Sequence, residues 1–403
     1  MNMYIEKGTA RGEIIAPASK SMAHRLLICA AICEGESCID RLPSCQDVLA
    51  TIDCLRAMGV KINYDGERAI VRGIDFANAK PNGALYCRES GSTLRFLIPL
   101  ALLSSEKICL AGSEKLISRP QGIFEEICHN EGFLFNKESD KITLQGKLSA
   151  GEYRLRGDVS SQFITGLLFA LSTLKDDSKI IITTKLESRS YVDLTISAMS
   201  EFGVKISWEN DYTLMIKGGQ KYTPTRLAVE GDWSGGSFID AFNHLGGSVE
   251  IQGLNQGSLQ GDRVYREYFN ALDLGFTEIN IEDCPDLAPI LFTLAAIKNG
   301  GKFIGTRRLK IKESDRAEAM KSELSKFGAD IIVEENTVTV NKTELHTPTE
   351  KLFGHNDHRI VMSLAVISSI FGGEIEGCEA VSKSYPDFFK DISTLGIHAY
   401  ETH

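Results

Sequence analysis

Phe202-Gly203-Val204-Lys205-Ile206 is one of six stretches in which a helix-like amphipathic run ends in a glycine and continues directly as a strand-like run. The others are Met58-Gly59-Val60-Lys61-Ile62, Glu131-Gly132-Phe133-Leu134, Leu274-Gly275-Phe276, Phe327-Gly328-Ala329-Asp330-Ile331 and Leu395-Gly396-Ile397. Their glycines lie 73, 71, 72, 53 and 68 residues apart, which is too long for a solenoid and suits a compact helix-and-strand unit. We therefore expect six copies of one α/β unit, each with a glycine in left-handed backbone after a helix.

A second landmark of each unit is a small or polar turn followed by an apolar run that predicts a buried helix. The turns are Ala18-Ser19-Lys20-Ser21, Glu89-Ser90-Gly91-Ser92-Thr93, Asp158-Val159-Ser160-Ser161-Gln162, Asp232-Trp233-Ser234-Gly235-Gly236, Cys284-Pro285-Asp286 and Asn356-Asp357-His358-Arg359. The helices are expected to start near Leu26, Leu94, Phe163, Phe238, Leu287 and Ile360. Free N–H groups and the helix dipole attract anions at such starts. One turn of this kind is ordinarily just an N-cap, whereas six in register predict an assembled anion site.

Length and composition set the broad class of the protein. The 403 residues predict two or three domains, and 43% hydrophobic with 24% charged residues is ordinary for a globular protein with a sizeable core. The net charge of −10 argues against nucleic acid as a partner. No segment approaches the ~20 apolar residues of a membrane span, and the start of the chain does not resemble a signal peptide. The ten cysteines show no zinc-binding spacing and are expected to be mostly buried. These features predict a cytoplasmic protein.

Domain boundaries follow from the repeat, because no clear linker is present. The polar stretch from Gly218 to Thr225 predicts a crossover between two halves of three units each. We assign residues 17–225 to one domain. Residues 1–16 could pair with either half, and we group them with residues 226–403 in the second domain.

Cationic residues recur near the turns. Lys20 and Arg25 follow the first turn, Arg119 precedes Pro120, and Lys312 and Arg316 are spaced so that they could share one helical face. Arg359 and Lys383 complete the set. Any one of these alone is best explained as part of a solvated helix start. Their repetition at corresponding points of several units favours a site for anionic ligands.

Six short motifs, in order along the chain, are similar to those of one enzyme family. They are Ala18-Ser19-Lys20-Ser21-Met22-Ala23-His24-Arg25, Ser118-Arg119-Pro120, Val159-Ser160-Ser161-Gln162-Phe163, Lys312-Glu313-Ser314-Asp315-Arg316, Asn356-Asp357-His358-Arg359 and Ser382-Lys383-Ser384-Tyr385-Pro386-Asp387. Together they resemble 5-enolpyruvylshikimate-3-phosphate (EPSP) synthases over essentially the whole chain. The resemblance implies an α/β fold of two similar domains, each with three βαβαββ units, in the inside-out barrel arrangement of the enolpyruvyl transferases. It also implies an active site in the cleft between the domains.

The resemblance also implies an activity. The family transfers the enolpyruvyl group of phosphoenolpyruvate to the 5-hydroxyl of shikimate 3-phosphate, through a tetrahedral ketal and with release of phosphate. This is a step of chorismate and aromatic amino acid biosynthesis in the shikimate pathway, and the family is the target of glyphosate. Both substrates are anionic, which explains the need for Arg, Lys and helix N-termini. A monomer that needs neither a cofactor nor a metal is expected.

Residue roles follow from the same resemblance. Phosphoenolpyruvate would be held by the Gly91 backbone and by Lys20, Arg119, Arg316, Arg359 and Lys383. Shikimate 3-phosphate would be held by Ser21, Arg25, Ser160, Ser161, Gln162, Ser188, Asp286 and Lys312. Asp286 matches the base that takes the proton of the hydroxyl, and Glu313 and Lys20 match the groups that exchange the carbon proton. Taken alone, Asp286 would be a helix cap, His358 a core or hinge histidine, and Tyr191 a packing aromatic.

The chain departs from the family pattern in two places, and two alternatives to the leading function stay open. Glu89-Ser90-Gly91-Ser92 places a carboxylate where many members carry an amide, so Glu89 is expected to turn away or to pair, for instance with Arg88 or Arg95. Arg308 stands near a position where some members have asparagine. The alternatives are a UDP-N-acetylglucosamine enolpyruvyl transferase, which usually carries Lys-Asn where this chain has Lys20-Ser21, and a non-catalytic anion-binding relative.

Overall fold

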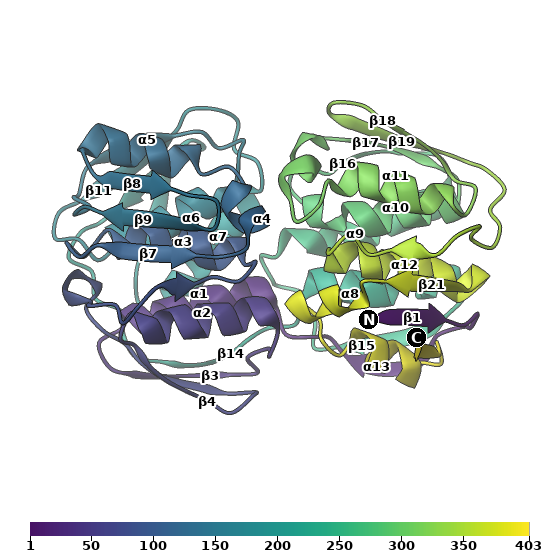
Figure 1. The fold of residues 1–403 in the computed structure, drawn as a ribbon, viewed down its shortest axis with the longest axis horizontal. Coiled ribbons are helices and arrows are strands. Elements are labelled where there is room, and N and C mark those ends of the chain that lie inside the picture. The colour runs from purple at the N-terminus through teal and green to yellow at the C-terminus, as the bar shows by residue number, and fades with distance from the viewer. Residues whose placement is uncertain (403) are drawn as a thin grey trace. The chain divides into compact units, whose positions relative to one another are not determined.

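The computed structural model describes residues 1–402, and the chain divides into two compact units. The continuous unit is Ala18–Glu230. The discontinuous unit combines Met1–Pro17 with the chain from Gly231 onward. Figure 1 shows helices and strands alternating within each unit. Each unit has its own hydrophobic core, so each is described separately here.

The continuous unit contains three four-stranded sheets with one shared topology, β14-β3-β5-β4, β6-β7-β9-β8 and β10-β11-β13-β12. In each sheet the first two strands are parallel and the other pairings are antiparallel. The strands are β3 Glu36–Asp40, β4 Lys61–Tyr64, β5 Ala69–Arg72, β6 Leu85–Tyr86, β7 Ile108–Ala111, β8 Leu134–Lys137, β9 Lys141–Gln145, β10 Glu152–Leu155, β11 Ser178–Ile182, β12 Ile206–Asn210, β13 Thr213–Ile216 and β14 Arg226–Ala228.

The discontinuous unit uses the same strand order in β16-β17-β19-β18 and in β20-β21-β1-β22. The first residues of the chain supply the antiparallel strand β1 (Asn2–Ile5), which pairs with β21 and β22, and β2 (Arg11–Ile15), which lies parallel to β15 (Ser248–Gln252). The remaining strands are β16 Glu278–Asn280, β17 Gly301–Ile304, β18 Asp330–Val333, β19 Thr337–Asn341, β20 Leu352–Phe353, β21 Gly373–Glu376 and β22 Ala399–Thr402.

Helices fill the interior of both units. Those of the continuous unit are α1 Lys20–Ile32, α2 Gln46–Ala57, α3 Gly91–Ala101, α4 Glu114–Ser118, α5 Gly122–Glu131, α6 Ser161–Leu171 and α7 Arg189–Glu201. Those of the discontinuous unit are α8 Trp233–Asp240, α9 Tyr265–Leu274, α10 Ala288–Ile297, α11 Arg316–Ser325, α12 His358–Phe371 and α13 Phe388–Thr394. The helices α6 and α10 carry no charged side chain and are buried almost all round, as expected for helices that are apolar on every face.

The buried helices α3 and α6 approach each other closely because α6 carries a glycine at the contact. A side chain at Gly166 would place its Cβ 2.4 Å from the carbonyl oxygen of Arg95. Their first turns carry Gly91 and Gln162, two of the predicted substrate-binding residues. The close packing of the two helices therefore fixes these residues relative to each other.

Two of the six predicted helix starts are too late along the chain, whereas the other four lie within three residues of the observed starts. The first helix begins at Lys20 rather than near Leu26, and α8 begins at Trp233 rather than near Phe238. Side chains of Ser19, Ser90 and Asp232 cap the helix N-termini, so the polar turns form the first helical turn. Backbone N–H groups at each start are therefore contributed by the motif residues themselves.

Five of the six predicted glycines have the expected left-handed backbone, with φ between 70° at Gly132 and 102° at Gly59. Gly275 is the exception, because its φ of 164° and ψ of −174° are those of extended backbone. The helix α9 ends at this point without the usual left-handed turn. The prediction for Gly275 is therefore wrong in conformation, although the helix does end there.

Two further expectations concern the whole chain. Within residues 1–402, we find no helix with the length and apolar character needed to cross a membrane. The ten cysteines are all free thiols, and all but Cys38 and Cys109 are buried.

Candidate active site

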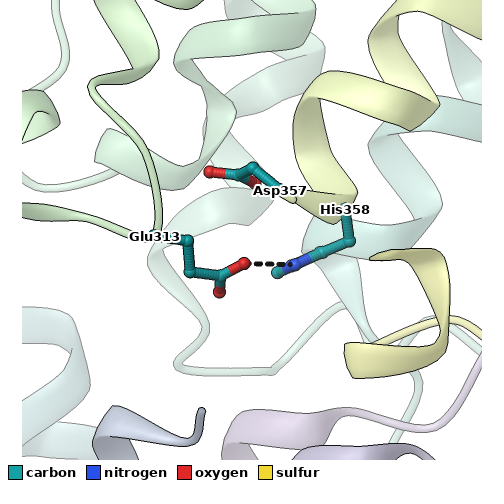
Figure 2. Close-up of side chains that lie close together, drawn as sticks. All are labelled: Glu313, Asp357 and His358. Atoms are coloured by element: carbon teal, nitrogen blue, oxygen red, sulfur yellow. Dashed lines mark hydrogen bonds and ion pairs between the residues drawn. The ribbon is translucent and has the colours of Figure 1, made fainter. Parts of the chain in front are cut away.

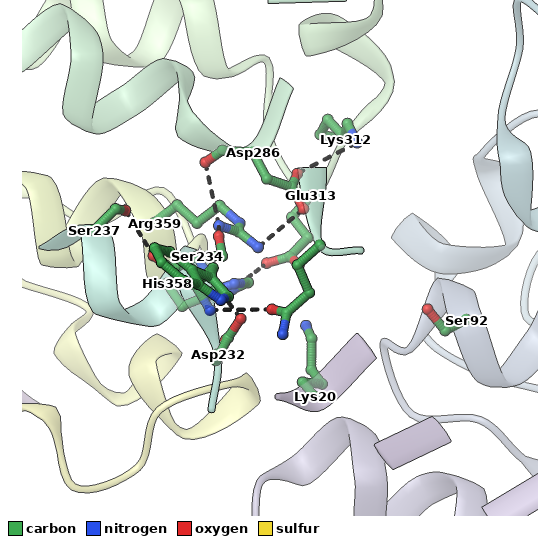
Figure 3. A network of polar contacts seen from close by, with 12 residues as sticks. Lys20, Ser92, Asp232, Ser234, Ser237, Asp286, Lys312, Glu313, His358 and Arg359 are labelled. Atoms are coloured by element: carbon green, nitrogen blue, oxygen red, sulfur yellow. Dashed lines mark hydrogen bonds and ion pairs between the residues drawn. The ribbon is translucent and has the colours of Figure 1, made fainter. Parts of the chain in front are cut away.

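Asp286 lies at the centre of a cluster of cations in the discontinuous unit (Figure 3). It belongs to the one-turn 3-10 helix η4 (Pro285–Leu287) that leads into α10. Its carboxylate accepts hydrogen bonds from Arg316 Nη1 at 2.7 Å and Arg359 Nη2 at 2.9 Å, and Lys312 Nζ is 3.4 Å away. The side chain is still 19% exposed. Asp286 is therefore an ion-paired and partly buried carboxylate, not a helix cap.

The surrounding charges control the protonation of Asp286 and Lys312. Burial raises the pKa of Asp286, but the charges of Arg359, Lys312 and Arg316 outweigh this effect and hold that pKa well below its usual value. Burial also lowers the pKa of Lys312 to about 8, against the opposing effect of Asp286. Asp286 is thus ionised at neutral pH, and Lys312 is the cation most easily neutralised.

The predicted geometry of the Lys312 motif is wrong in one respect. Lys312 ends the 3-10 helix η5 (Arg307–Ile311), whereas Arg316 begins α11 after the cap residue Asp315. The two cations therefore do not share a helical face. They reach Asp286 from two different elements, because the residues between them form an irregular turn.

Glu313, Asp357 and His358 lie together beside this cluster (Figure 2). His358 is buried, and its Nδ1 is 3.0 Å from Glu313 Oε2. The ligand-type atoms of the three residues lie within 4.8 Å of one another. Asp357, however, already accepts from Arg316 Nε at 2.8 Å and from Ser314 Oγ at 3.1 Å. A metal would have to compete with Arg316, so the set is better described as an acid–base pair beside a buried ion pair.

The turn formed by His355 and Asn356 connects Lys383 to the start of α12, where Asp357, His358 and Arg359 lie. His355 and Asn356 both have left-handed backbone, with φ of 50° and 51°, a conformation that is uncommon for non-glycine residues but enriched for asparagine and histidine. Lys383 Nζ donates to the Asn356 carbonyl at 2.6 Å, and Asp357 then caps α12 through the Arg359 N–H. The six predicted residues of this unit, Asp286, Lys312, Glu313, Arg316, Arg359 and Lys383, are thus connected around one turn.

The continuous unit gathers a second group of predicted residues around Gly91. An ideal Cβ at Gly91 would lie 3.0 Å from Arg119 Nη1 and 3.5 Å from Gln162 Oε1. The Gln162 amide donates to Ser92 Oγ at 3.0 Å. Ser160 caps α6 through the Gln162 N–H, and Ser161 is the first, buried residue of that helix. A glycine, an arginine and an amide therefore converge at two helix N-termini.

Lys20 and Arg25 occupy the first helix of the continuous unit and have different surroundings. Lys20 Nζ pairs with Asp47 at 2.9 Å, and both side chains are largely buried. Arg25 donates to Thr195 Oγ1 and to the carbonyls of Ser21 and Tyr191. Its charge is buried without a carboxylate partner among residues 1–402, and its guanidinium fixes the start of α1 against α7.

Ser188 stands immediately before α7. It is buried and has left-handed backbone, with φ of 60°. The Tyr191 ring, expected to be a packing aromatic, lies 5.9 Å from the Arg25 guanidinium carbon. Ser188 is thus held in an unfavourable conformation one turn from the Arg25 contact.

Several partners of the predicted residues were not predicted. Asp47 pairs with Lys20, Asp357 with Arg316, and Arg359 contacts Ser234. Each pair joins residues far apart in the sequence. The only local signal for such a pair is a charged residue in an otherwise apolar helix start, because a buried charge needs a partner. Arg308, whose role the sequence leaves open, is buried and donates to the Glu282 carbonyl.

Replacing Asp357 by alanine is expected to lower the free energy of unfolding by about 3–5 kcal/mol, because it removes one of the two carboxylates that pair with the buried Arg316 and leaves Arg316 Nε without its acceptor. The two side chains are 0% and 2% exposed. Urea unfolding followed by circular dichroism measures the effect. Glu36→Ala is the matched control, since its pair with Arg72 is exposed and is worth at most about 1 kcal/mol. Equal losses in the two variants would contradict the prediction.

Comparisons with known proteins agree with the resemblance seen in the motifs. The family model for EPSP synthase (3-phosphoshikimate 1-carboxyvinyltransferase) matches residues 6–392. The 3-phosphoshikimate 1-carboxyvinyltransferase of Clostridium kluyveri is 40% identical over 407 residues, covering 96% of this chain and 95% of that relative. The one from Clostridium perfringens strain 13 is 38% identical and covers 98% of both chains.

The fold is similar to that of solved structures as well. An EPSP synthase from Acinetobacter baumannii superposes with a TM-score of 0.79 over 100% of both chains, at 21% identity. The fold is therefore the two-domain, inside-out α/β fold of the enolpyruvyl transferases, as predicted. Within that class, the chain belongs to the EPSP synthase family, the 3-phosphoshikimate 1-carboxyvinyltransferases.

Proposed function

We propose that this chain carries out the reaction of its family with Asp286, Glu313 and Lys20 as the catalytic residues. The reaction transfers the enolpyruvyl group of phosphoenolpyruvate to the 5-hydroxyl of shikimate 3-phosphate and releases phosphate. The observation that carries the proposal is the convergence of Lys312, Arg316 and Arg359 on one carboxylate, Asp286. Such a group offers both an acceptor for a hydroxyl proton and cations for anionic substrates.

The substrates would use the two groups of residues described above. The anionic groups of phosphoenolpyruvate would bind Arg316, Arg359 and Lys383 in one unit and Lys20, Arg119 and the Gly91 backbone in the other. Shikimate 3-phosphate would bind Lys312 and Asp286, together with Ser21, Arg25, Ser160, Ser161, Gln162 and Ser188. The proposal thus requires one active site to which both units contribute. We also retain the expectation of a cytoplasmic monomer.

The reaction needs two opposite proton movements at carbon. In the addition step, the 5-hydroxyl oxygen bonds to C2 of phosphoenolpyruvate, Asp286 takes the hydroxyl proton, and the methylene carbon gains a proton to give a tetrahedral ketal. In the elimination step, that carbon loses a proton, and the bond between C2 and the phosphate oxygen breaks. Glu313, held by His358 at 3.0 Å, and Lys20 would exchange the carbon proton.

Substrate binding would also adjust Asp286 for its task. Three cations keep the pKa of Asp286 low, which favours the ionised form that can accept a proton. The phosphate and carboxylate of phosphoenolpyruvate would share Arg316 and Arg359, weaken their pairing with Asp286 and raise its basicity. The low pKa in the free site and the role as a base are therefore compatible.

One assay tests the proposed function. Phosphate release from phosphoenolpyruvate is measured with shikimate 3-phosphate and, separately, with UDP-N-acetylglucosamine as the acceptor. Release only with shikimate 3-phosphate is expected. Release only with the nucleotide sugar would favour the sister transferase, and release with neither acceptor would favour a non-catalytic relative.

The pH dependence of kcat/KM should follow the titration of the Lys312 ammonium group. Because its pKa is about 8, its positive charge is present below that pH and is lost above it. We expect kcat/KM for shikimate 3-phosphate to fall above pH 8, by about one decade per pH unit. Lys312→Arg keeps the charge at high pH, so the alkaline fall should disappear in this variant even if its activity is lower. An alkaline limb that is the same in both proteins would contradict the assignment.

A further inference from the structure

Arg95 is a buried cation that the predicted residue set does not include. It lies in α3, one turn after Gly91, and the residue is 7% exposed. Among residues 1–402, no carboxylate pairs with it. Its guanidinium carbon instead lies 4.9 Å from the centre of the Phe163 ring. A buried charge without an acidic partner is costly, so its retention calls for a specific role.

The guanidinium joins three separate segments. Arg95 Nη1 donates to Gln162 Oε1 of α6 at 2.7 Å, and Nη2 donates to the Pro120 carbonyl, which follows Arg119, at 3.0 Å. A planar guanidinium can make both bonds at a fixed angle, which a lysine cannot. The orientation of Gln162 and the turn that carries Arg119 are therefore set by one side chain.

The same atoms surround Gly91. A Cβ at Gly91 would lie 3.0 Å from Arg119 Nη1, 3.5 Å from Gln162 Oε1 and 3.9 Å from Arg95 Nη1. Glu89 was expected either to turn away or to pair, for instance with Arg88 or Arg95. Arg88 instead pairs with Asp53 at 2.7 Å, and Arg95 makes the contacts given above. Arg95 is therefore bonded to residues around Gly91 and not to Glu89.

The hydrogen bond from Arg95 also determines whether the N–H or the oxygen of the Gln162 amide is left to contact a ligand. Because Oε1 accepts from Arg95, the amide nitrogen points to Ser92 Oγ, at 3.0 Å, and keeps a second N–H. With the amide reversed, the nitrogen would face the guanidinium, and the oxygen would be presented in its place. An oxygen in that position would repel an anion, whereas the N–H attracts one.

We propose that Arg95 is a positioning residue for phosphoenolpyruvate: it holds the Gln162 amide with its N–H outward and fixes the turn that carries Arg119. This inference rests on the proposed function. Arg95 itself need not touch the substrate. Its charge adds to that of Arg119, and the two guanidinium groups repel each other. The anionic substrate would relieve this repulsion.

The first test is a double-mutant cycle of Arg95→Lys and Gln162→Ala. We expect Arg95→Lys to raise the KM for phosphoenolpyruvate about tenfold, the loss of one oriented hydrogen bond, with a smaller change in the KM for shikimate 3-phosphate. The double variant should be clearly less impaired than the sum of the two single effects, because part of the effect of Arg95 passes through Gln162 and the rest through the turn that carries Arg119. Arg25→Lys is the matched control, since Arg25 is also buried and stacks on Phe96, and it should affect shikimate 3-phosphate instead. Additive effects in the cycle would overturn the inference.

A second variant covers the case in which Arg95→Lys does not fold. Gln162→Glu keeps the shape of the side chain and gives Arg95 a buried carboxylate, but it removes the outward N–H. We expect thermal stability to be retained and the KM for phosphoenolpyruvate to rise at least about tenfold. An unchanged KM would overturn the inference. Absence of phosphate release by the wild-type enzyme with shikimate 3-phosphate would contradict the proposed function. Normal release by the wild type with an unchanged KM in the variants would contradict only the inference about Arg95.

Discussion

Asp286→Ala is expected to abolish measurable turnover while binding of shikimate 3-phosphate remains detectable. The variant loses the only carboxylate that lies within reach of Lys312, Arg316 and Arg359 together among the described residues. Loss of a general base typically costs ~10²–10⁴-fold in rate. Single-turnover phosphate release measures the chemical step, and isothermal titration with shikimate 3-phosphate measures binding.

The control for Asp286 separates catalysis from folding. Asp286→Asn keeps the volume and one acceptor for Arg316, which also retains Asp357 as a partner. The asparagine variant should therefore fold with nearly normal thermal stability and be as inactive as the alanine variant. A kcat close to that of the wild type in either variant would remove Asp286 from the mechanism.

Local patterns explain how much of the fold could be predicted. A glycine after an amphipathic run and a serine or aspartate before an apolar run act within a few residues, so they mark helix ends in the sequence itself. This is why Gly59, Gly132 and Gly203 were correctly placed in left-handed backbone. The starts of α1 and α8 are predicted too late because apolar periodicity begins only after the capping turn, as at Lys20.

The contacts within the candidate site could not be predicted in the same way. Asp47 reaches Lys20 across 27 residues, and Asp357 reaches Arg316 across 41. Such pairs depend on how helices pack, and they leave no period in the sequence. In the sequence, Arg95 stands out only as one candidate partner for Glu89, because nothing local distinguishes an arginine that bonds Gln162 and Pro120 from one on a helix surface. The family resemblance named residues one by one but not the contacts that hold them.

Lys20→Met is expected to weaken phosphoenolpyruvate binding and also to slow the chemical step. Lys20 is proposed both to bind the substrate and to exchange the carbon proton, so its loss removes a charge-assisted bond worth about 1.5–3 kcal/mol and a proton-transfer group worth ~10²–10⁴-fold. Titration with phosphoenolpyruvate in the presence of shikimate 3-phosphate measures the first effect. Single-turnover kinetics at saturating substrate measure the second.

The pairing of Lys20 with Asp47 makes this experiment informative. Both side chains are largely buried, at 14% and 10% exposed, so methionine in place of Lys20 leaves Asp47 without its cation, and some loss of stability is expected. Lys20→Arg restores the charge for Asp47 but not the compact ammonium group. It should recover thermal stability and part of the phosphoenolpyruvate affinity, while the chemical step stays slow. If Lys20→Met binds phosphoenolpyruvate as tightly as the wild type, Lys20 does not hold that substrate, and if the chemical step is also unchanged, the proton exchange falls to Glu313.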